Sequence, residues 1–167
     1  MKPRARLSRP RARDAAEFLA AVRRSRRLHG NWVTAPASPA AYRKYLRRAR
    51  RRTQAGYFIR LRDSGELVGV VNVSEIVRGN FQSAYLGYYA FAPYQGRGLM
   101  SEGLRLVMAD AFRRLKLHRL EANIQPANRA SRALVRGLGF RREGYSPRYL
   151  KIAGRWRGHE RWAITKD

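Results

Sequence analysis

The feature that most constrains the fold is a change of hydrophobic period near residue 95. Upstream of it, residues 57–62, 67–77 and 83–91 are rich in β-branched and aromatic residues and are separated by short turns, which predicts a three-stranded antiparallel meander. Downstream, apolar residues recur every three or four positions over Gly98–Leu117, which is typical of one face of a helix. A meander followed by a long helix predicts a sheet with a helical crossover between its middle strands.

Shorter elements flank this central block. Their predicted bounds, in chain order, are 3–7 (strand), 14–28 and 38–53 (helices), then 120–124 (strand), 127–138 (helix), and 149–152 with 156–164 (a hairpin). The chain of 167 residues is the length of one domain, so we expect a single domain over residues 1–167. Its fold class is α/β (α+β), with a twisted sheet of about seven strands, mostly antiparallel, and four helices.

Composition excludes several classes of protein. Hydrophobic residues make up 44% of the chain, which argues against wholesale disorder. The absence of cysteine excludes a disulfide scaffold, a thiolate metal site and a cysteine nucleophile. The sequence has no apolar run long enough for a membrane helix and no apolar stretch behind its basic N-terminus. We therefore expect a soluble, cytoplasmic protein with no membrane partner.

The charge balance is strongly basic. Thirty-seven basic residues against eleven acidic ones give a net charge of +26 at pH 7, and arginine is far more abundant than lysine. Such a chain is attracted to polyanions, and arginine suits phosphate because its planar fork donates two hydrogen bonds at once. The alternative is a compositional bias in which arginine replaces lysine on solvated helices. The densest cluster, Arg47–Arg52, is either a solvated helix end or a phosphate contact.

The segment between the meander and the long helix is rich in glycine. Gly96 and Gly98 can adopt turns closed to other residues and let the backbone approach a ligand. The helix that follows offers free N–H groups and a partial positive charge, which together suit a pyrophosphate. The dinucleotide-binding and P-loop patterns do not fit, because a third glycine and a Gly-Lys-Ser/Thr are missing. A turn that binds nothing is the alternative interpretation.

The run Gln95-Gly96-Arg97-Gly98-Leu99-Met100 resembles the acetyl-CoA motif of the GNAT N-acetyltransferases. A second block, with Asn128-Arg129-Ala130-Ser131, Leu138-Gly139-Phe140 and Glu143-Gly144, resembles the branch that acetylates ribosomal-protein N-terminal alanines (the Rim type). Tyr85-Leu86-Gly87-Tyr88 is similar to the enzymes acting on small-subunit protein S5. The resemblance implies the GNAT fold, in which the sheet is splayed between its fourth and fifth strands.

The resemblance also implies a set of residues that bind acetyl-CoA, the acetyl donor. The strand end at Phe91 and Ala92 would lie beside the pantetheine arm, with an N–H near Phe91 polarising the thioester. The pyrophosphate would bind at Gln95, Gly96, Arg97, Gly98, Leu99, Met100 and Ser101. Asn128 would hold a pantetheine amide, although an asparagine here also suits a helix N-cap.

Chemistry and acceptor binding are assigned in the same way. The resemblance implies that Ser131 protonates the leaving thiolate, and one of Arg129, Arg132 and Arg136 would pair with the 3′-phosphate of CoA. For the base that takes the amine proton, Glu75 is favoured over Glu121 and over water. Trp32 and Tyr88 are expected to line the acceptor site. Such a reaction requires no metal.

These inferences predict an enzyme that transfers acetyl from acetyl-CoA to the N-terminal α-amine of a ribosomal protein, by direct attack on the thioester. The basic surface would contact ribosomal RNA. Two alternatives stay open at this point. The acceptor could be a small amine, such as a polyamine, an aminoglycoside or an amino compound. The chain could also be a basic RNA- or ribosome-binding assembly factor whose acetyltransferase core is idle.

Overall fold

The structure is a computed structural model that describes residues 4–166, and it contains one seven-stranded sheet. Its elements in chain order are β1 (Ala5–Ser8), the 3-10 turn η1 (Ala12–Asp14), α1 (Ala15–Arg24), α2 (Arg26–His29), α3 (Pro39–Ala49), β2 (Ala55–Leu61), β3 (Leu67–Val77), β4 (Ser83–Ala90), α4 (Leu99–Arg113), β5 (Arg119–Ile124), α5 (Arg129–Gly137), β6 (Arg141–Ile152) and β7 (Arg155–Thr165). The strand order β1-β2-β3-β4-β5-β7-β6 confirms the mixed α/β fold, with α4 as the crossover.

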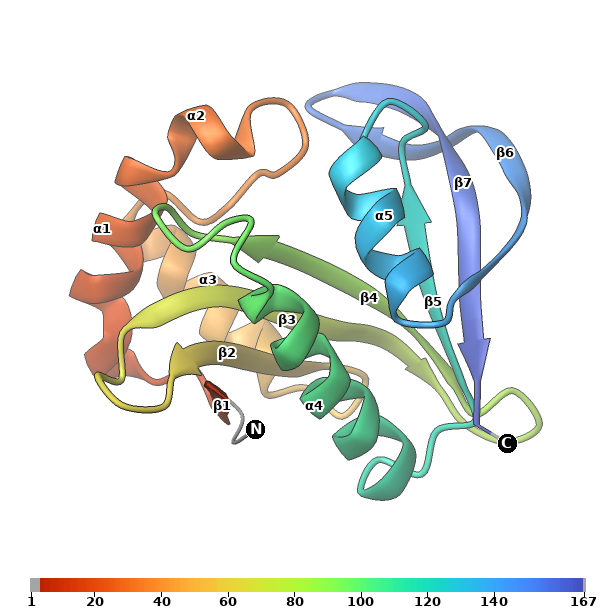
Figure 1. The fold of residues 1–167 in the computed structure, drawn as a ribbon, viewed down its shortest axis with the longest axis horizontal. Helices are drawn as coiled ribbons and strands as arrows, with labels where there is room; N and C mark the ends of the chain where they lie inside the picture. The colour runs from red at the N-terminus through yellow and green to blue at the C-terminus, as the bar shows by residue number, and fades with distance from the viewer. Residues whose placement is uncertain (1–3, 167) are drawn as a thin grey trace.

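The sheet is splayed between β4 and β5. These two strands are parallel, and they pair only where Ser83–Tyr85 meets Arg119–Glu121. Figure 1 shows β4 and β5 diverging from this point, with β2 to β4 crossing the view, β5 running steeply upward and β7 running down beside it. The backbone of the second half of β4 therefore lacks a neighbouring strand on one side, as the resemblance to the GNAT fold implied.

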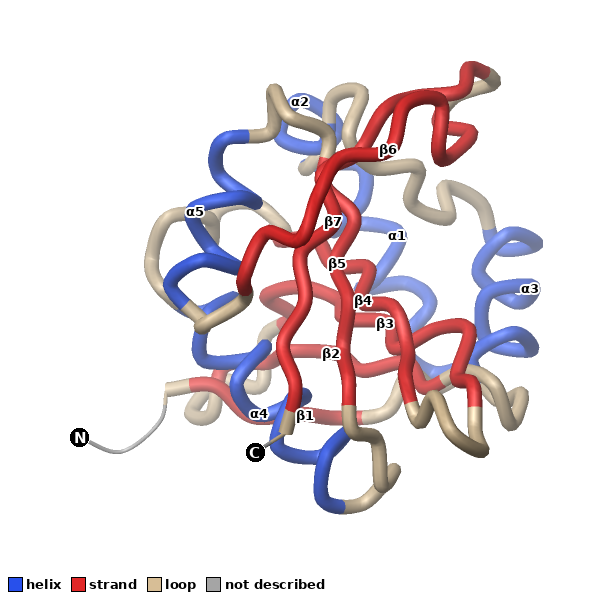
Figure 2. The backbone as a smooth tube through the Cα atoms, turned by 90° about the vertical axis from the view of Figure 1, so that its right-hand side faces the viewer, coloured by secondary structure: helices blue, strands red, loops and turns tan. Residues whose placement is uncertain are grey.

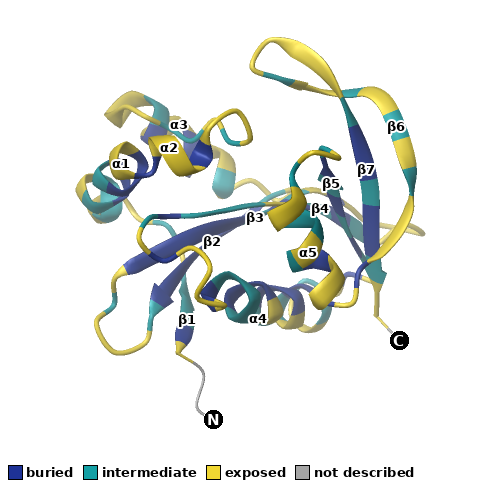
Figure 3. Cartoon of the chain, turned by 45° about the horizontal axis from the view of Figure 1, so that its top comes forward, coloured by how far each residue is buried: buried dark blue, intermediate teal, exposed yellow. Residues whose placement is uncertain are grey.

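Helices cover both faces of the sheet. Figure 2 shows α4 and α5 on one side and α1 and α3 on the other. The predicted apolar stripe of the long helix is confirmed, because Leu104, Val107, Met108 and Ala111 are buried in the main core. A second core cluster, centred on Phe18, lies between the helices of the opposite face and the sheet. Burial is concentrated in the central strands, whereas the far end of the β6–β7 hairpin is exposed (Figure 3).

Two elements differ from the prediction. The first expected helix is interrupted at Ser25, so that the described residues contain five α-helices rather than four. Ser25 is fully buried and its side chain bonds to another part of the chain, which helical periodicity does not reveal. Strand β6 begins at Arg141 rather than 149. Its first half is polar because it is an exposed edge strand, and it carries two register shifts.

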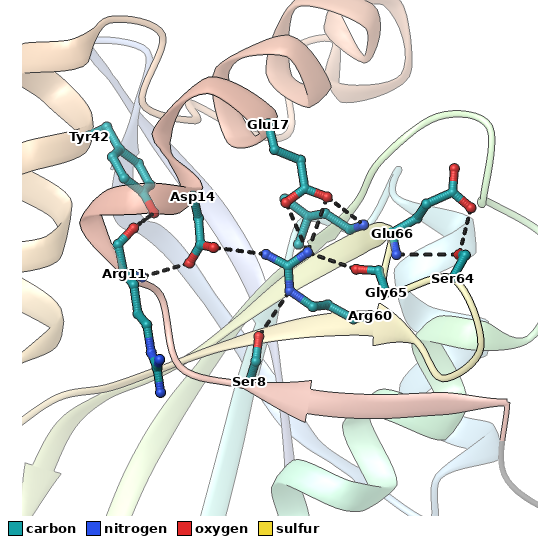
Figure 4. A network of polar contacts seen from close by, with 10 residues as sticks. Ser8, Arg11, Asp14, Glu17, Tyr42, Arg60, Ser64, Gly65 and Glu66 are labelled. Carbon is teal, nitrogen blue, oxygen red and sulfur yellow. Dashed lines mark hydrogen bonds and ion pairs between the residues drawn. The ribbon is translucent and has the colours of Figure 1, made fainter.

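Arg60 on β2 anchors α1 to the sheet through a buried polar network (Figure 4). Its guanidinium donates to Glu17 at 2.8 Å, to Asp14 at 3.2 Å and to the Gly65 carbonyl at 2.8 Å. Its Nε donates to Ser8 on β1 at 3.1 Å. Every donor group of a buried cation is thereby occupied, which is the condition for burying an arginine without a large penalty.

Within residues 4–166, no helix is both long and apolar enough to cross a bilayer.

Candidate active site

A cavity of about 470 Å³ opens at the splay. It lies between α2 and the loop after it, the end of β4, the start of α4 and the first turns of α5. Its lining residues are Leu28, His29, Trp32, Val33, Tyr88, Tyr89, Ala90, Tyr94, Gln95, Gly96, Gly98, Met100, Ser101, Asn128, Ala130, Ser131 and Leu134. Nine of the residues predicted from the sequence are therefore brought together here: Trp32, Tyr88, Gln95, Gly96, Gly98, Met100, Ser101, Asn128 and Ser131.

The backbone amides at the end of β4 differ in whether they already have a hydrogen-bond partner. The N–H of Phe91 donates to the Val68 carbonyl of β3 at 2.7 Å, and that of Ala92 donates to Ser25 Oγ at 3.0 Å. Both amides are occupied, and neither residue lines the cavity. The Phe91 and Ala92 amides are therefore not free for a ligand, and the predicted N–H near Phe91 has to come from a neighbouring residue. Successive residues of a strand direct their N–H groups to opposite sides, so the N–H of Ala90 faces the splay.

Three side chains of the α1–α2 junction hold this strand end in place; we call them the β4 clamp. Arg24 Nε donates to the Ala92 carbonyl at 2.7 Å, and Ser25 accepts from the Ala92 amide. His29 Nε2 lies 2.8 Å from the Ala90 carbonyl. A carbonyl can only accept, so this nitrogen carries the proton. The β4 clamp connects α1 and α2 to β4, the strand that borders the splay.

The glycine-rich loop places the start of α4, which has no side-chain N-cap, beside the cavity. Gly98 is the N-cap of α4 and has φ of +76°, a left-handed conformation that strains any residue with a Cβ. Because glycine has no side chain, no cap hydrogen bond satisfies the first N–H groups of α4. These groups and the positive end of the helix dipole lie beside the cavity lined by Gly96, Met100 and Ser101.

Two predicted residues of this loop point elsewhere. Arg97 does not line the cavity; its guanidinium lies 5.9 Å from the ring centre of Tyr94, and its carbonyl accepts from Arg4 at 2.9 Å. Leu99 is buried in the main core. The loop therefore offers the cavity its backbone and its small residues rather than a charged side chain.

The start of α5 carries a polar pair. Asn128 caps α5, because its Oδ1 accepts from the Ser131 N–H at 3.1 Å. This confirms the N-cap interpretation and leaves the Asn128 NH2 group without a hydrogen-bond partner among residues 4–166. Ser131 Oγ lies 2.6 Å from the hydroxyl of Tyr88 on β4. Burial raises the pKa of Tyr88 to about 12, so the phenol keeps its proton at neutral pH.

Carboxylates do not reach this cavity from the part of the chain that the structure describes. Glu75 is exposed on β3 with φ of +50°, at a register shift opposite the paired end of β4, and accepts from Gln54. Glu121 on β5 accepts from Arg119 at 2.8 Å. Neither lines the cavity, so the assignment of Glu75 as the base is withdrawn.

Some cavity residues were missed by sequence reasoning. His29 lies one residue beyond the predicted first helix; in the structure it ends α2 and is buried against the rings of Tyr89 and Phe91. Ala90 and Tyr89 follow from strand alternation once the edge of β4 that faces the splay is known. Trp32, at 40% exposure, forms part of the mouth as expected for an acceptor site.

The three arginines of α5 differ in how far they are engaged. Arg132 Nε lies 3.1 Å from buried Glu160, and Arg136 lies over the ring of Trp162 at 5.7 Å. Arg129, the first residue of α5, is exposed and forms no ion pair within residues 4–166. Of the three arginines considered as partners for the 3′-phosphate, Arg129 is the one with neither an ion pair nor a ring contact among residues 4–166.

Comparisons with known proteins agree with this geometry. Residues 4–141 match the family described as an acetyltransferase (GNAT) domain. The chain is 44% identical over 103 residues to ribosomal protein uS5-alanine N-acetyltransferase of Escherichia coli K12, a match covering 62% of this chain and 53% of that protein. It is 41% identical over 98 residues to the probable N-acetyltransferase YjcK of Bacillus subtilis, covering 59% of this chain and 54% of that protein. The chain thus spans about half the length of these curated relatives.

A solved structure resembles the whole chain. Mycobacterium smegmatis RimJ, described as a complex with CoA-disulfide, superposes with a TM-score of 0.88 at 28% identity, over 96% of this chain and 81% of that one. The splayed sheet, the uncapped helix after a glycine-rich loop and the match over residues 4–141 agree with one another. The chain belongs to the GNAT acetyltransferase family.

Proposed function

We propose that this chain transfers the acetyl group of acetyl-CoA to the N-terminal α-amine of a ribosomal protein. The observation that carries the proposal is the meeting, in one cavity, of the uncapped start of α4 and the hydroxyl pair of Ser131 and Tyr88. The first suits a pyrophosphate, and the second suits a departing thiolate. Both lie along a splay that leaves strand amides open to an extended ligand arm.

Each group has a task in this proposal. The N–H groups at the start of α4 bind the pyrophosphate, and Arg129 pairs with the 3′-phosphate. The NH2 group of Asn128 donates to a pantetheine carbonyl. The Ala90 N–H, rather than that of Phe91, donates to the thioester oxygen and stabilises the charge that develops there. When bound, acetyl-CoA supplies an activated acetyl group: the amine nitrogen forms a bond to the carbonyl carbon, and the carbon–sulfur bond breaks.

Proton transfer follows from the absence of a carboxylate in the described lining of the cavity. An α-amine has a pKa near 8, so about a tenth of it is neutral at pH 7 without a base. Water at the cavity mouth can take the proton released after attack. Ser131 donates toward the sulfur, and the phenol of Tyr88 donates to Ser131 in turn, which keeps the serine oriented.

The choice of acceptor rests on two observations. One curated relative, 44% identical over 103 residues, is named a ribosomal protein uS5-alanine N-acetyltransferase. A polyamine would need carboxylates to hold its charges, and the lining that the structure describes provides none. The net charge of +26 favours docking on a ribonucleoprotein, so we include contact with ribosomal RNA in the proposal.

Cofactor binding is tested with two matched glycine variants. Gly98→Val introduces a strained left-handed residue at the start of α4, whereas Gly79→Val introduces the same strain in the open β3–β4 turn, where φ is +65°. Isothermal titration with CoA should show binding to the wild type and to Gly79→Val, and at least tenfold weaker binding to Gly98→Val. Equal affinity in all three proteins would contradict the proposed site.

The acceptor is tested by following CoA release with peptides. A peptide with the N-terminal sequence of ribosomal protein uS5 should be acetylated on its α-amine, and the same peptide with a blocked N-terminus should not react. Spermidine serves as the competing acceptor. Faster turnover with spermidine than with the peptide would replace the proposed acceptor by a small amine.

A further inference from the structure

We propose that the β1 edge of the sheet carries a groove that binds the phosphate backbone of RNA, separate from the acetyl-transfer cavity. We call it the arginine groove, and its cations are Arg6, Arg9, Arg11, Arg13, Arg50 and Arg114. The inference rests on the proposed function, because it locates the surface by which an enzyme acting on ribosomal proteins would dock.

The groove is continuous. One hollow contains Arg6, Arg11 and Arg13 and has the buried Arg60 network at its base. A second, beside the end of α4, contains Tyr57, Asp110 and Arg114. A third lies at the end of α3 and contains Arg50. Arg9 lines all three hollows, so they form one surface along β1 and the ends of two helices.

The acidic residues of this surface all accept hydrogen bonds from neighbouring side chains. Asp14 and Glu17 both accept from the buried Arg60 (Figure 4). Asp110 accepts from Tyr57 at 2.6 Å and from Arg114 at 2.8 Å, and the bond from Arg114 leads the interactions that lower the pKa of Asp110. Asp14 and Glu17 share the single charge of Arg60, and the excess negative charge of this network is outweighed by the cations Arg6, Arg11 and Arg13 that line the same hollow.

The outer arginines are available by contrast. Arg6, Arg11 and Arg13 form no ion pair within the described part of the chain. Figure 4 shows the side chain of Arg11 extending away from Asp14, although its backbone N–H donates to that carboxylate. Three unpaired guanidinium groups, which outnumber the one carboxylate charge left over by Arg60, suit a run of phosphates, and Arg binds phosphate through two parallel hydrogen bonds.

The sequence explains why this surface is basic. The cluster Arg47–Arg52, either a helix end or a phosphate contact from sequence alone, lies at the end of α3 and brings Arg50 into the groove. All five of its arginines are exposed. The cluster therefore extends the arginine groove rather than the acetyl-transfer cavity.

The cavity and the Arg114 end of the groove lie at opposite ends of α4. Gly98 precedes α4 at the cavity, and Arg114 follows α4 at the groove. A helix of 15 residues is about 22 Å long, and the two sites share no lining residue. RNA bound in the groove would leave the cavity open, so an acceptor held on a ribonucleoprotein could enter it.

The test compares two triple variants of equal charge. Arg6→Gln, Arg11→Gln and Arg13→Gln together remove three cations of the groove. The control, Arg23→Gln, Arg141→Gln and Lys166→Gln, removes three exposed cations from other elements. Binding of a fluorescently labelled RNA duplex is measured by anisotropy at several KCl concentrations, from about 50 to 300 mM. CoA release with the uS5 peptide is measured on the same proteins.

The groove variant should bind RNA at least tenfold more weakly than the wild type. Its slope of log affinity against log salt should also fall by about three, one for each lost phosphate contact. The control should stay within about twofold. Equal weakening in both variants would overturn the groove in favour of diffuse charge, and binding of phosphatidylglycerol vesicles in place of RNA would overturn the choice of partner. Peptide turnover should be the same in all three proteins, and its absence from the wild type would instead refute the proposed function.

Discussion

At the scale of single residues, the hydroxyls of Tyr88 and Ser131 connect two elements across the splay. Tyr88 lies on β4 and Ser131 on α5, and their oxygens are 2.6 Å apart. Since burial raises the pKa of Tyr88 to about 12, the phenol keeps its proton throughout the range in which an N-terminal amine changes its charge.

We therefore expect Tyr88→Phe and Ser131→Ala each to lower kcat about tenfold to a hundredfold, and the double variant to be little slower than the worse single one. A phenol of ordinary pKa would begin to lose its proton near pH 9, but this one should not. The rate ratio of wild type to Tyr88→Phe should thus be constant from about pH 6 to 10. Tyr85→Phe, on the same strand but outside the cavity lining, is the control and should keep wild-type turnover.

The positions of cavity residues were predictable where the sequence motif carries a side chain. Asn128 and Ser131 have the right spacing at the start of α5 and line the cavity. Which amide near Phe91 faces the splay was not predictable, because it depends on the register of β4 with β3. Glu75 does not line the cavity, since a register shift and the position of the paired end of β4 are not visible in the sequence.

At the scale of elements, the β4 clamp determines where the strand that borders the splay ends. Ser25 and His29 are polar residues buried in otherwise apolar surroundings, and both bond to the backbone at the end of β4. Burying a polar side chain costs free energy, and the hydrogen bonds of Ser25 and His29 offset that cost. The break between α1 and α2 at Ser25 is the local consequence.

Ser25→Ala would leave the partly buried Ala92 N–H without its hydrogen-bond partner, at a cost of about 1 kcal/mol. Because that amide lies at the end of β4, we expect KM for acetyl-CoA to rise about tenfold, with a smaller change in kcat. The comparison variant is Ala16→Gly, at an exposed position of α1, which weakens this helix by about 1 kcal/mol without touching the clamp. It should lower Tm but leave KM unchanged. A rise in KM shared by both variants would show that only stability is involved.

Element type was predictable for the meander and for α4, since their hydrophobic periods are regular. The start of β6 was not, because Arg141 to Arg148 are largely exposed and carry no apolar alternation. The interruption of the first helix depends on a contact between residues 25 and 92, which are distant in the sequence. Local patterns cannot report such contacts.

At the scale of the whole molecule, a net charge of +26 repels itself. Some arginines pair with acids in local networks, such as that of Arg60. Most other cations of residues 4–166 lie on the surface without an ion pair. Repulsion among them raises the free energy of the compact state, and salt screens it over about 10 Å at 0.1 M.

We expect thermal unfolding monitored by circular dichroism to show Tm rising with KCl between about 10 and 150 mM. A gain of 1 kcal/mol corresponds to about 2–4 °C for a chain of this size. Sucrose at matched osmolarity controls for effects of the solute alone and should produce a smaller rise. A Tm that stays constant or falls with KCl would show that self-repulsion does not limit the stability.

The helical crossover between the middle strands could be predicted from the change of period near residue 95, whereas the position of β7 between β5 and β6 was not predicted. The arginine groove could not be placed, since its cations come from β1, the loop after it and the ends of α3 and α4. The number of basic residues in the sequence indicates that a basic surface exists. Its position depends on how the elements pack.

The short ladder between β4 and β5 has a mechanical consequence. Three residue pairs are all that join the two halves of the sheet there, so this line is a natural hinge. An extended pantetheine arm lying against the amides of β4 would take the place of the missing strand segment. The acetyl donor would then stiffen the protein along the line between β4 and β5 each time it binds. The stiffening would end when the thiol product departs.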